Sequence, residues 1–333
     1  MNSNANVKTK KMTYSLAMND AHFIALRTDP TCYVIGQGVN NPWFVGNTTT
    51  GLIDEFGTTR LMDAPISEAA MTGAAIGSAM AGMHPIVFHP RMDFMYLALD
   101  QIINHCASWN YMFDGKVNVP IVIRAIINRG GEQGAQHSQS PFVLYANIPG
   151  LKVVCPATPY DAKGLLLAAL ADPNPVIYID DRWLYDEEGD VPEGYYTTEI
   201  GQANVLREGD DVSIIAASYM VKQAMKAAAE LAEQGISCEV VDIRSMKPLD
   251  METINKSIAK TGRAVIAIAE WGFCSVSSEI AQGIYKANYK TLKHSVEMVN
   301  LPNIPAPASK SLEDVYYPTH VNIKAAIMKC IDE

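Results

Sequence analysis

Short apolar runs alternate with segments of helical periodicity along the chain of 333 residues. Short apolar runs bounded by turn residues are typical of buried strands. In the first half of the chain such strands are predicted at residues 32–36, 85–88, 119–125, 151–156 and 174–180. Helices are predicted to begin near Ser67, Phe94 and Asp161. This order predicts βαβ units and a mainly parallel sheet.

The alternation stops at residues 181–196, which are acidic and rich in turn residues and lack an apolar period. We interpret this segment as a linker. Beyond it the pattern resumes, with strands predicted at residues 210–218, 237–245, 263–270 and 297–301, a helix at 221–235 and a last helix near His320. The sequence therefore predicts an α/β protein of two domains, residues 12–190 and 197–333, each with a mainly parallel sheet flanked by helices.

Composition narrows the class of protein. Hydrophobic residues make up 48% of the chain and charged residues 19%, which argues against a disordered or fibrous protein. The net charge of −10, with only a short basic stretch at residues 8–11, disfavours nucleic-acid binding. The six cysteines lack metal-ligand spacing, and the polar N-terminus lacks a secretory signal, so we expect reduced thiols and a cytoplasmic location.

One uncharged stretch, residues 69–88, is long enough to cross a bilayer. It consists mostly of small residues and is interrupted by Pro85, so we expect a tightly packed helix followed by a strand, and no membrane span.

A short glycine motif, Gly36-Gln37-Gly38, follows a predicted strand. It lacks the third glycine and the later acidic residue of a dinucleotide site and is weak evidence for one.

The most informative segment spans residues 63–77. Ser67 is a good N-cap, and Glu68 follows in the first helical turn, where the helix dipole favours a carboxylate. Gly73 and Gly77 lie one turn apart and leave one face of the helix nearly free of side-chain atoms, so another backbone can approach closely. By itself, this segment also fits a helix at a subunit interface, with Glu68 as an ordinary first-turn acid.

The spacing of Glu68, Gly73 and Gly77 resembles the motif of the pyrimidine-binding domain in thiamin-diphosphate enzymes. From about residue 12 to its end, the chain resembles the beta subunit of the heterotetrameric 2-oxo acid dehydrogenases, the first component of the pyruvate and branched-chain complexes. The resemblance is carried by the segments LMDAPISE, LALDQIIN, AQHSQS, LKVVCPATPYDAKGLL, DPNPVIYI, VLREGDDVSII, DIRSMKPLD and NIPAPASKSLEDVYYP. It implies a thiamin-diphosphate pyrimidine-binding fold followed by a transketolase C-terminal fold.

The resemblance also implies roles for single residues. Glu68 matches the glutamate that bonds to N1′ of the aminopyrimidine and, by sharing a proton there, helps remove the C2 proton of the thiazolium. Phe94 matches the aromatic residue that stacks on the pyrimidine, although its helical spacing from Leu97 and Gln101 also fits a core residue. His137 matches the active-site histidine of the beta subunit, which serves proton and acyl transfer. Its loop lacks apolar partners, which favours catalysis over a core role.

Metal sites follow from the same resemblance. A structural potassium ion is implied at Ile121, Ala169, Leu170, Asp172 and Asn174, although the last two are also common turn residues. The Gly-Asp-Gly segment that binds magnesium in the family is absent from this sequence. We therefore expect a separate alpha subunit to hold Mg²⁺ and the diphosphate of a shared cofactor, in an α2β2 assembly with a beta–beta contact through the Gly73 and Gly77 helix.

Two departures from the family pattern bear on the substrate. The family usually has an acidic pair where this chain has Gln37-Gly38, and mostly apolar residues where it has His89 and Arg91. The polar residues fit either a surface loop or a polar, anionic substrate whose carboxylate or phosphate pairs with Arg91.

Three functions are compatible with these features. The first is decarboxylation of a 2-oxo acid with acyl transfer to a lipoyl group on a separate acyltransferase. The alternative is a two-chain carboligase or transketolase that acts on a polar or sugar-like substrate without a lipoyl partner. A non-catalytic subunit that merely completes a dimer is disfavoured because Glu68 and His137 are both retained.

Overall fold

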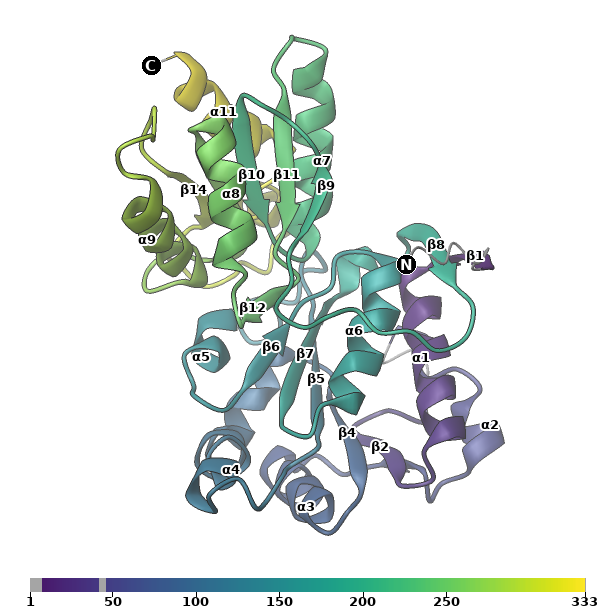
Figure 1. Cartoon of the computed structure of the whole chain (residues 1–333). Coiled ribbons are helices and arrows are strands. Elements are labelled where there is room, and N and C mark those ends of the chain that lie inside the picture. The colour runs from purple at the N-terminus through teal and green to yellow at the C-terminus, as the bar shows by residue number, and fades with distance from the viewer. Residues whose placement is uncertain (1–7, 42–45, 333) are drawn as a thin grey trace. The chain divides into compact units, whose positions relative to one another are not determined.

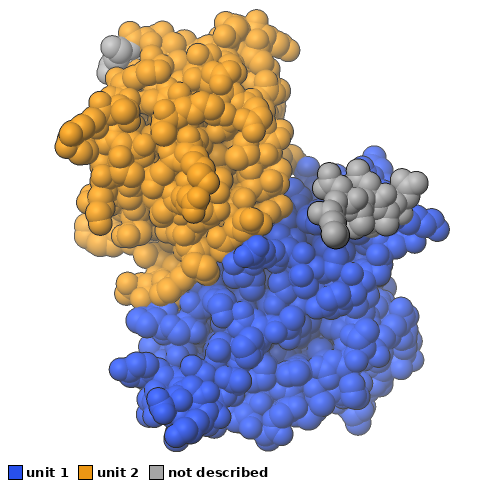
Figure 2. All heavy atoms as spheres, viewed as in Figure 1, with its two compact units in different colours: residues 1–126, 148–200 blue, residues 127–147, 201–333 orange. Residues whose placement is uncertain are grey.

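The computed structural model describes residues 8–41 and 46–332 and forms two compact units (Figures 1 and 2). The first comprises residues up to 126 together with 148–200, and the second comprises 127–147 together with the residues from 201 onward. Each unit has its own sheet flanked by helices, so the predicted two-domain α/β class is confirmed. The predicted domain ranges are continuous, whereas the compact units are not, because residues 127–147 group with the second.

The sheet of the first unit runs in the order β6-β7-β5-β4-β2-β3. Its strands are β2 (Cys32–Gly36), β3 (Leu61–Asp63), β4 (His84–His89), β5 (Val122–Ile127), β6 (Lys152–Val154) and β7 (Val176–Asp181). β2 pairs in parallel with both β3 and β4, so Gly36 lies opposite Asp63 on one side and Phe88 on the other. The strands of a parallel sheet are buried on both faces, which is why they read as continuous apolar runs and were predictable.

The helices of the first unit differ in whether a side chain caps their N-terminus. They are α1 (Tyr14–Thr28), α2 (Leu52–Phe56), α3 (Glu68–Met80), α4 (Trp109–Met112) and α6 (Pro159–Ala171). Thr158 caps α6 by accepting from the backbone N–H of Asp161. Ser67 occupies the N-cap position of α3 as predicted, but its side chain makes no capping hydrogen bond. The uncharged stretch at residues 69–88 is α3 followed by β4, and no helix among the described residues has the length and hydropathy to cross a bilayer.

The regular helix predicted to begin near Phe94 is absent from the described structure. The segment forms a 3-10 helix, η1 (Met92–Ala98), followed by a π-helical segment, η2 (Gln101–Cys106). Both pack against α3. A change of helical pitch lets the segment follow the surface of α3, and such a change is not encoded in apolar spacing alone.

The interpretation of residues 181–196 as a linker is wrong for most of that segment. Residues Arg182–Leu184 form the 3-10 helix η3, and β8 (Glu188–Pro192) pairs antiparallel with β1 (Thr9–Thr13). The buried ammonium of Lys163 donates to the carbonyl oxygen of Pro192 at 2.8 Å, which attaches β8 to α6. Most side chains of β8 remain at least partly exposed, so the strand has no apolar run to reveal it.

The sheet of the second unit runs in the order β14-β13-β10-β11-β9. Its strands are β9 (Asn204–Arg207), β10 (Val212–Ala216), β11 (Cys238–Asp242), β13 (Ala264–Trp271) and β14 (Glu297–Leu301), with only β9 antiparallel to its neighbour. The other elements of this unit are α5 (Phe142–Ala146), α7 (Tyr219–Ala232), α8 (Met251–Thr261), α9 (Val276–Asn288), α10 (Lys310–Tyr316), α11 (His320–Asp332) and the short strand β12 (Ser245–Lys247). α7 packs on α11 and α8 packs on α9.

Candidate active site

Glu68 is the first residue of α3 and is only 5% exposed. The side-chain amide Nε2 of Gln37 donates to its Oε1 at 3.0 Å. Within the described residues no other hydrogen bond to this carboxylate is found, so Oε2 is left for a ligand. A carboxylate at a helix N-terminus also lies in the favourable field of the helix dipole. The first helical turn of α3 therefore presents one carboxylate oxygen that is held and one that is available.

Phe94 lies in η1, the segment that packs on α3. Its neighbours Met92, Met95 and Ala98 are fully buried and fill the core, whereas Phe94 is only half-buried. The core positions of η1 are therefore occupied by other residues. This leaves the aromatic ring in the intermediate environment that a stacking surface needs, and the stacking role stays a prediction.

His89, the last residue of β4, is fully buried, and its Nε2 lies 3.2 Å from the Thr72 hydroxyl of α3. Burial lowers its pKa to about 4, so the ring is neutral at physiological pH. The surface-loop interpretation is wrong for His89, because the centre of the parallel sheet encloses it. As a neutral ring it cannot supply positive charge to an anion, and its contact with a substrate stays a prediction.

Arg91 follows two residues later and is half-buried. Burial lowers the pKa of its guanidinium, and the positive charge of Arg182 acts in the same direction. Its Nη1 donates to the carbonyl oxygen of Pro90 at 2.6 Å. Arg182 was not a predicted site residue, and the sequence offers no signal for it, because it lies in the segment interpreted as a linker. Two guanidinium groups thus act electrostatically on one another beside the end of β4.

His137 belongs to the second unit, in the segment 127–147, whereas Glu68 belongs to the first. Two contacts near His137 attach its loop to the body of that unit. The backbone N–H of Glu132 donates to both carboxylate oxygens of Glu313, at 3.1 and 3.2 Å. The Ser140 hydroxyl donates to the carbonyl oxygen of Ala269 at 2.5 Å. The loop is therefore anchored on both sides of the histidine.

The residues predicted for a potassium ion lie in the first unit around the start of β7. The carboxylate of Asp172 pairs with Lys152 at 2.8 Å and accepts from the backbone N–H of Asn174 at 3.0 Å. The carbonyl of Ile121 accepts from Val176. The side-chain oxygen of Asn174 is buried without a hydrogen-bond partner in the described structure. A buried oxygen without a partner is compatible with a hard cation, and the ion itself stays a prediction.

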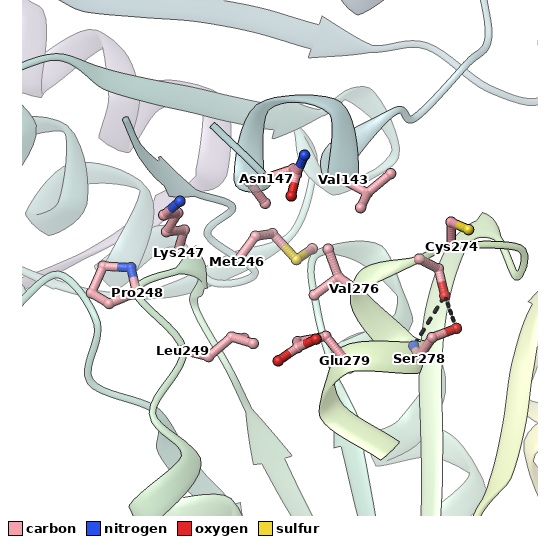
Figure 3. Close-up of a pocket in the computed structure, with 12 residues that line it drawn as sticks. Val143, Asn147, Met246, Lys247, Pro248, Leu249, Cys274, Val276, Ser278 and Glu279 are labelled. Atoms are coloured by element: carbon pink, nitrogen blue, oxygen red, sulfur yellow. Dashed lines mark hydrogen bonds between the residues drawn. The ribbon is translucent and has the colours of Figure 1, made fainter. Parts of the chain in front are cut away.

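Two hollows lie outside the predicted catalytic, cofactor and metal residues, and the first includes the predicted contact face at Gly73 and Gly77. In the first unit, a groove of about 400 Å³ runs along the small-residue face of α3 and is bordered by Gln101, His105 and Trp109. In the second unit, a cavity of about 720 Å³ lies between α5, the segment after β12 and the start of α9 (Figure 3). Its polar lining includes Asn147, Lys247, Ser278 and Glu279, and burial lowers the pKa of Lys247.

Comparisons with known proteins match the two halves of the chain to two different domain families, with residues 127–147 inside the first match although they group with the second compact unit. Residues 10–187 match the family model of the transketolase pyrimidine-binding domain, and residues 201–323 match that of the transketolase C-terminal domain. The pyruvate dehydrogenase E1 component subunit beta of Rickettsia felis is 38% identical over 96% of this chain and 98% of its own length. The chain belongs to the family of beta subunits of thiamin-diphosphate-dependent 2-oxo acid dehydrogenases.

A second relative in this family is the acetoin:2,6-dichlorophenolindophenol oxidoreductase subunit beta of Cupriavidus necator, 43% identical over 96% of this chain and 97% of its own length. Both relatives are named as subunits of oxidoreductases, which favours a dehydrogenase over a carboligase or transketolase. A solved structure described as a split-gene transketolase, inactive beta4 tetramer, matches with a TM-score of 0.77 at 24% identity, covering 96% of this chain and 98% of that one. At that identity the match shows the fold alone.

Proposed function

We propose that this chain is the beta subunit of an α2β2 thiamin-diphosphate enzyme that decarboxylates a 2-oxo acid and passes the acyl group to a lipoyl acceptor. The observation that carries the proposal is the buried Glu68 carboxylate at the start of α3, with one oxygen held by Gln37 and the other available. Membership in a thiamin-diphosphate-dependent family supports it. Thiamin diphosphate supplies a carbon nucleophile and an electron sink when bound.

The residues of this chain would hold the pyrimidine end of that cofactor. Glu68 would share a proton at its free oxygen with N1′, and Phe94 would supply an aromatic surface for stacking. His137 moves a proton during transfer of the acyl group. The diphosphate and its Mg²⁺ belong to the alpha subunit in this proposal, and a potassium ion near Asn174 stabilises the start of β7. The proposal also keeps the cytoplasmic location that the sequence predicts.

The groove on α3 supports the proposed assembly. In the part of the chain that the structure describes, a Cβ added at Gly77 would meet no atom within 4 Å beyond the adjacent helix backbone, and Ala70 and Ala74 of the same helix are exposed. Large apolar side chains of the same unit are also exposed, including Leu97 of η1 at 64% and Tyr111 of α4 at 91%. Exposed apolar side chains and an open helix face in one unit favour a surface that a partner covers. We assign it to a partner subunit, with the beta–beta contact made through the Gly73 and Gly77 face.

The substrate is inferred from charge. Arg91 and Arg182 place two guanidinium groups near the end of β4, which suits the carboxylate of a 2-oxo acid. A second candidate is acetoin, a neutral hydroxyketone, because the Cupriavidus necator relative carries that name. The two substrates are distinguishable by product: cleavage of a 2-oxo acid releases carbon dioxide, whereas cleavage of acetoin releases an aldehyde.

The test is an assay of the chain assembled with its alpha subunit, thiamin diphosphate and Mg²⁺, with dye reduction as the readout. We expect 2-oxo acids to release carbon dioxide, and Glu68→Gln to lower turnover by about 100-fold or more. Arg91→Ala should raise the KM for a 2-oxo acid much more than the KM for acetoin. Turnover that survives Glu68→Gln unchanged would refute the catalytic assignment, and equal effects of Arg91→Ala on both substrates would refute the charge argument.

A further inference from the structure

The turn that follows β2 contains two glycines, Gly36 and Gly38, that no other residue could replace without strain. Gly36, the last residue of β2, faces Phe88 of β4 so closely that an added Cβ would lie 2.5 Å from the Phe88 carbonyl oxygen. Gly38 has a φ of +70°, a conformation that side chains rarely adopt. The two glycines are therefore required by close packing at one position and by backbone conformation at the other.

Hydrogen bonds fix the same turn from the side of β3. The backbone N–H of Gly38 donates to Oδ1 of Asp63, the last residue of β3, at 2.7 Å. The backbone N–H of Ala64 donates to the carbonyl oxygen of Gly36 at 2.9 Å. Since strands β2 and β3 are also paired in parallel, the backbone on both sides of Gln37 is anchored to the sheet.

Gln37 lies between these glycines, and its side-chain amide donates to Glu68. We propose that Gln37 is a positioning residue for Glu68. The turn, anchored to the sheet on both sides, holds the side-chain amide of Gln37 in place. That amide in turn fixes the orientation of the Glu68 carboxylate, which leaves Oε2 for the cofactor pyrimidine. The inference deepens the proposed function and rests on it. It gives the Gly36-Gln37-Gly38 segment a function other than binding a dinucleotide.

A glutamine suits this position for a chemical reason. Its amide N–H donates at every pH, because the group does not titrate. A carboxylic acid at the same place could donate only when protonated and would otherwise repel Glu68. Gln37 therefore holds Glu68 by a bond that does not itself compete for the proton that Glu68 shares.

The first test measures cofactor binding, without turnover. Calorimetry on the assembled protein compares thiamin diphosphate with an analogue that carries a C–H group in place of N1′. If Gln37 acts through Glu68, Gln37→Ala weakens binding of the natural cofactor by about 10-fold and leaves binding of the analogue nearly unchanged. Equal weakening of both ligands, or of neither, would overturn the inference, because the effect would not pass through the N1′ contact.

The second test uses Gln37→Glu, which keeps the side-chain length and therefore does not depend on how well Gln37→Ala folds. Two adjacent carboxyl groups share a proton and titrate as a pair. We expect the rate of exchange of the C2 proton of bound thiamin diphosphate to pass through an ionisation that the wild-type protein lacks. Superimposable pH profiles for the variant and the wild type would contradict the positioning role.

Two controls separate the inference from the proposed function. Asn104→Ala removes another amide-to-carboxylate hydrogen bond, to Asp100 at 2.7 Å on the exposed surface, and should change neither readout. Glu68→Gln should weaken cofactor binding and slow C2 exchange. If Glu68→Gln has no effect, the proposed function itself is wrong. If Glu68→Gln has its effect but Gln37→Ala stays within about 2-fold of the wild type, only the positioning role is wrong.

Discussion

At the scale of single residues, Glu270 is a buried acid of the second unit that the proposed function does not use. It ends a run of apolar residues in β13, is 2% exposed, and accepts from the backbone N–H and the hydroxyl of Ser277 at 2.8 and 2.9 Å. Burial outweighs these hydrogen bonds and raises its pKa to about 7 from an ordinary value of 4.5. Its other oxygen has no hydrogen-bond partner among the described residues.

This pKa makes stability depend on pH in a defined direction. Between pH 4.5 and about 7, the folded protein keeps a proton on Glu270 that the unfolded chain has lost. The free energy of unfolding therefore falls as pH rises through that range, by about 3 kcal/mol, and the loss is complete above it. Glu270→Gln removes the ionisation, so the Tm of the variant relative to the wild type should rise between pH 5 and pH 8.

Thermal unfolding at a series of pH values checks this expectation. Glu279→Gln, on the exposed side of α9, is the matched control and should show no such trend. A Tm difference between Glu270→Gln and the wild type that stays constant with pH would contradict the assignment.

At the scale of elements, α10 determines the conformation of the loop that carries His137. Both carboxylate oxygens of Glu313 accept from the backbone N–H of Glu132, and the backbone N–H of Lys310 donates back to the Glu132 side chain at 3.3 Å. An added Cβ at Gly134 would lie 3.3 Å from Ala308, so the loop also packs closely on the segment before α10. Loss of the Glu313 carboxylate would leave a partly buried N–H without an acceptor.

We expect Glu313→Leu to speed hydrogen exchange at the Glu132 amide of the full chain by about 10-fold or more. Glu313→Gln, which retains one acceptor oxygen, should have a smaller effect. Asp314→Asn changes a neighbouring exposed acid of the same helix and should leave the loop protected. Unchanged exchange at Glu132 in the leucine variant would show that α10 does not hold the loop.

At the scale of the whole molecule, substitutions in the α3 groove should affect folding and assembly of the α2β2 species differently. Among the described residues, a Cβ added at Gly77 meets no atom within 4 Å beyond the adjacent backbone of its own helix, so Gly77→Ala should raise stability by about 1 kcal/mol through helix propensity. Gly77→Leu should fold equally well but fill the groove, and size-exclusion chromatography with light scattering should then show loss of the α2β2 species. Ala229→Leu, on the exposed face of α7, controls for added apolar surface. Full assembly of Gly77→Leu would place the interface elsewhere.

Prediction from sequence succeeded where the signal was local and failed where it was not. The strand at residues 32–36 was predicted with the bounds of β2, because a β-branched run ends at a turn glycine. The strand β8 was not predicted, because most of its side chains are at least partly exposed and its partner β1 lies far away in the sequence. The pitch of η1 and η2 was also missed, because contact with α3 determines it.

The features of the candidate site also fall into those that local spacing predicts and those that tertiary contacts determine. Glu68 at a helix start and the bare face at Gly73 and Gly77 were evident from spacing alone, because one helical turn relates these residues. The neutral, buried state of His89 was not evident, since it depends on the position of β4 within the sheet and on Thr72 across from it.

The sequence by itself determined the two α/β units, the residue that begins α3 and the family to which the chain belongs, because all three are encoded in local order and spacing. Only the tertiary structure decided which side chains touch. Gln37 and Glu68 are 31 residues apart, and Glu132 and Glu313 are 181 apart. Each pair is joined only once strands and helices pack, because a hydrogen bond depends on distance in space and not on distance along the chain.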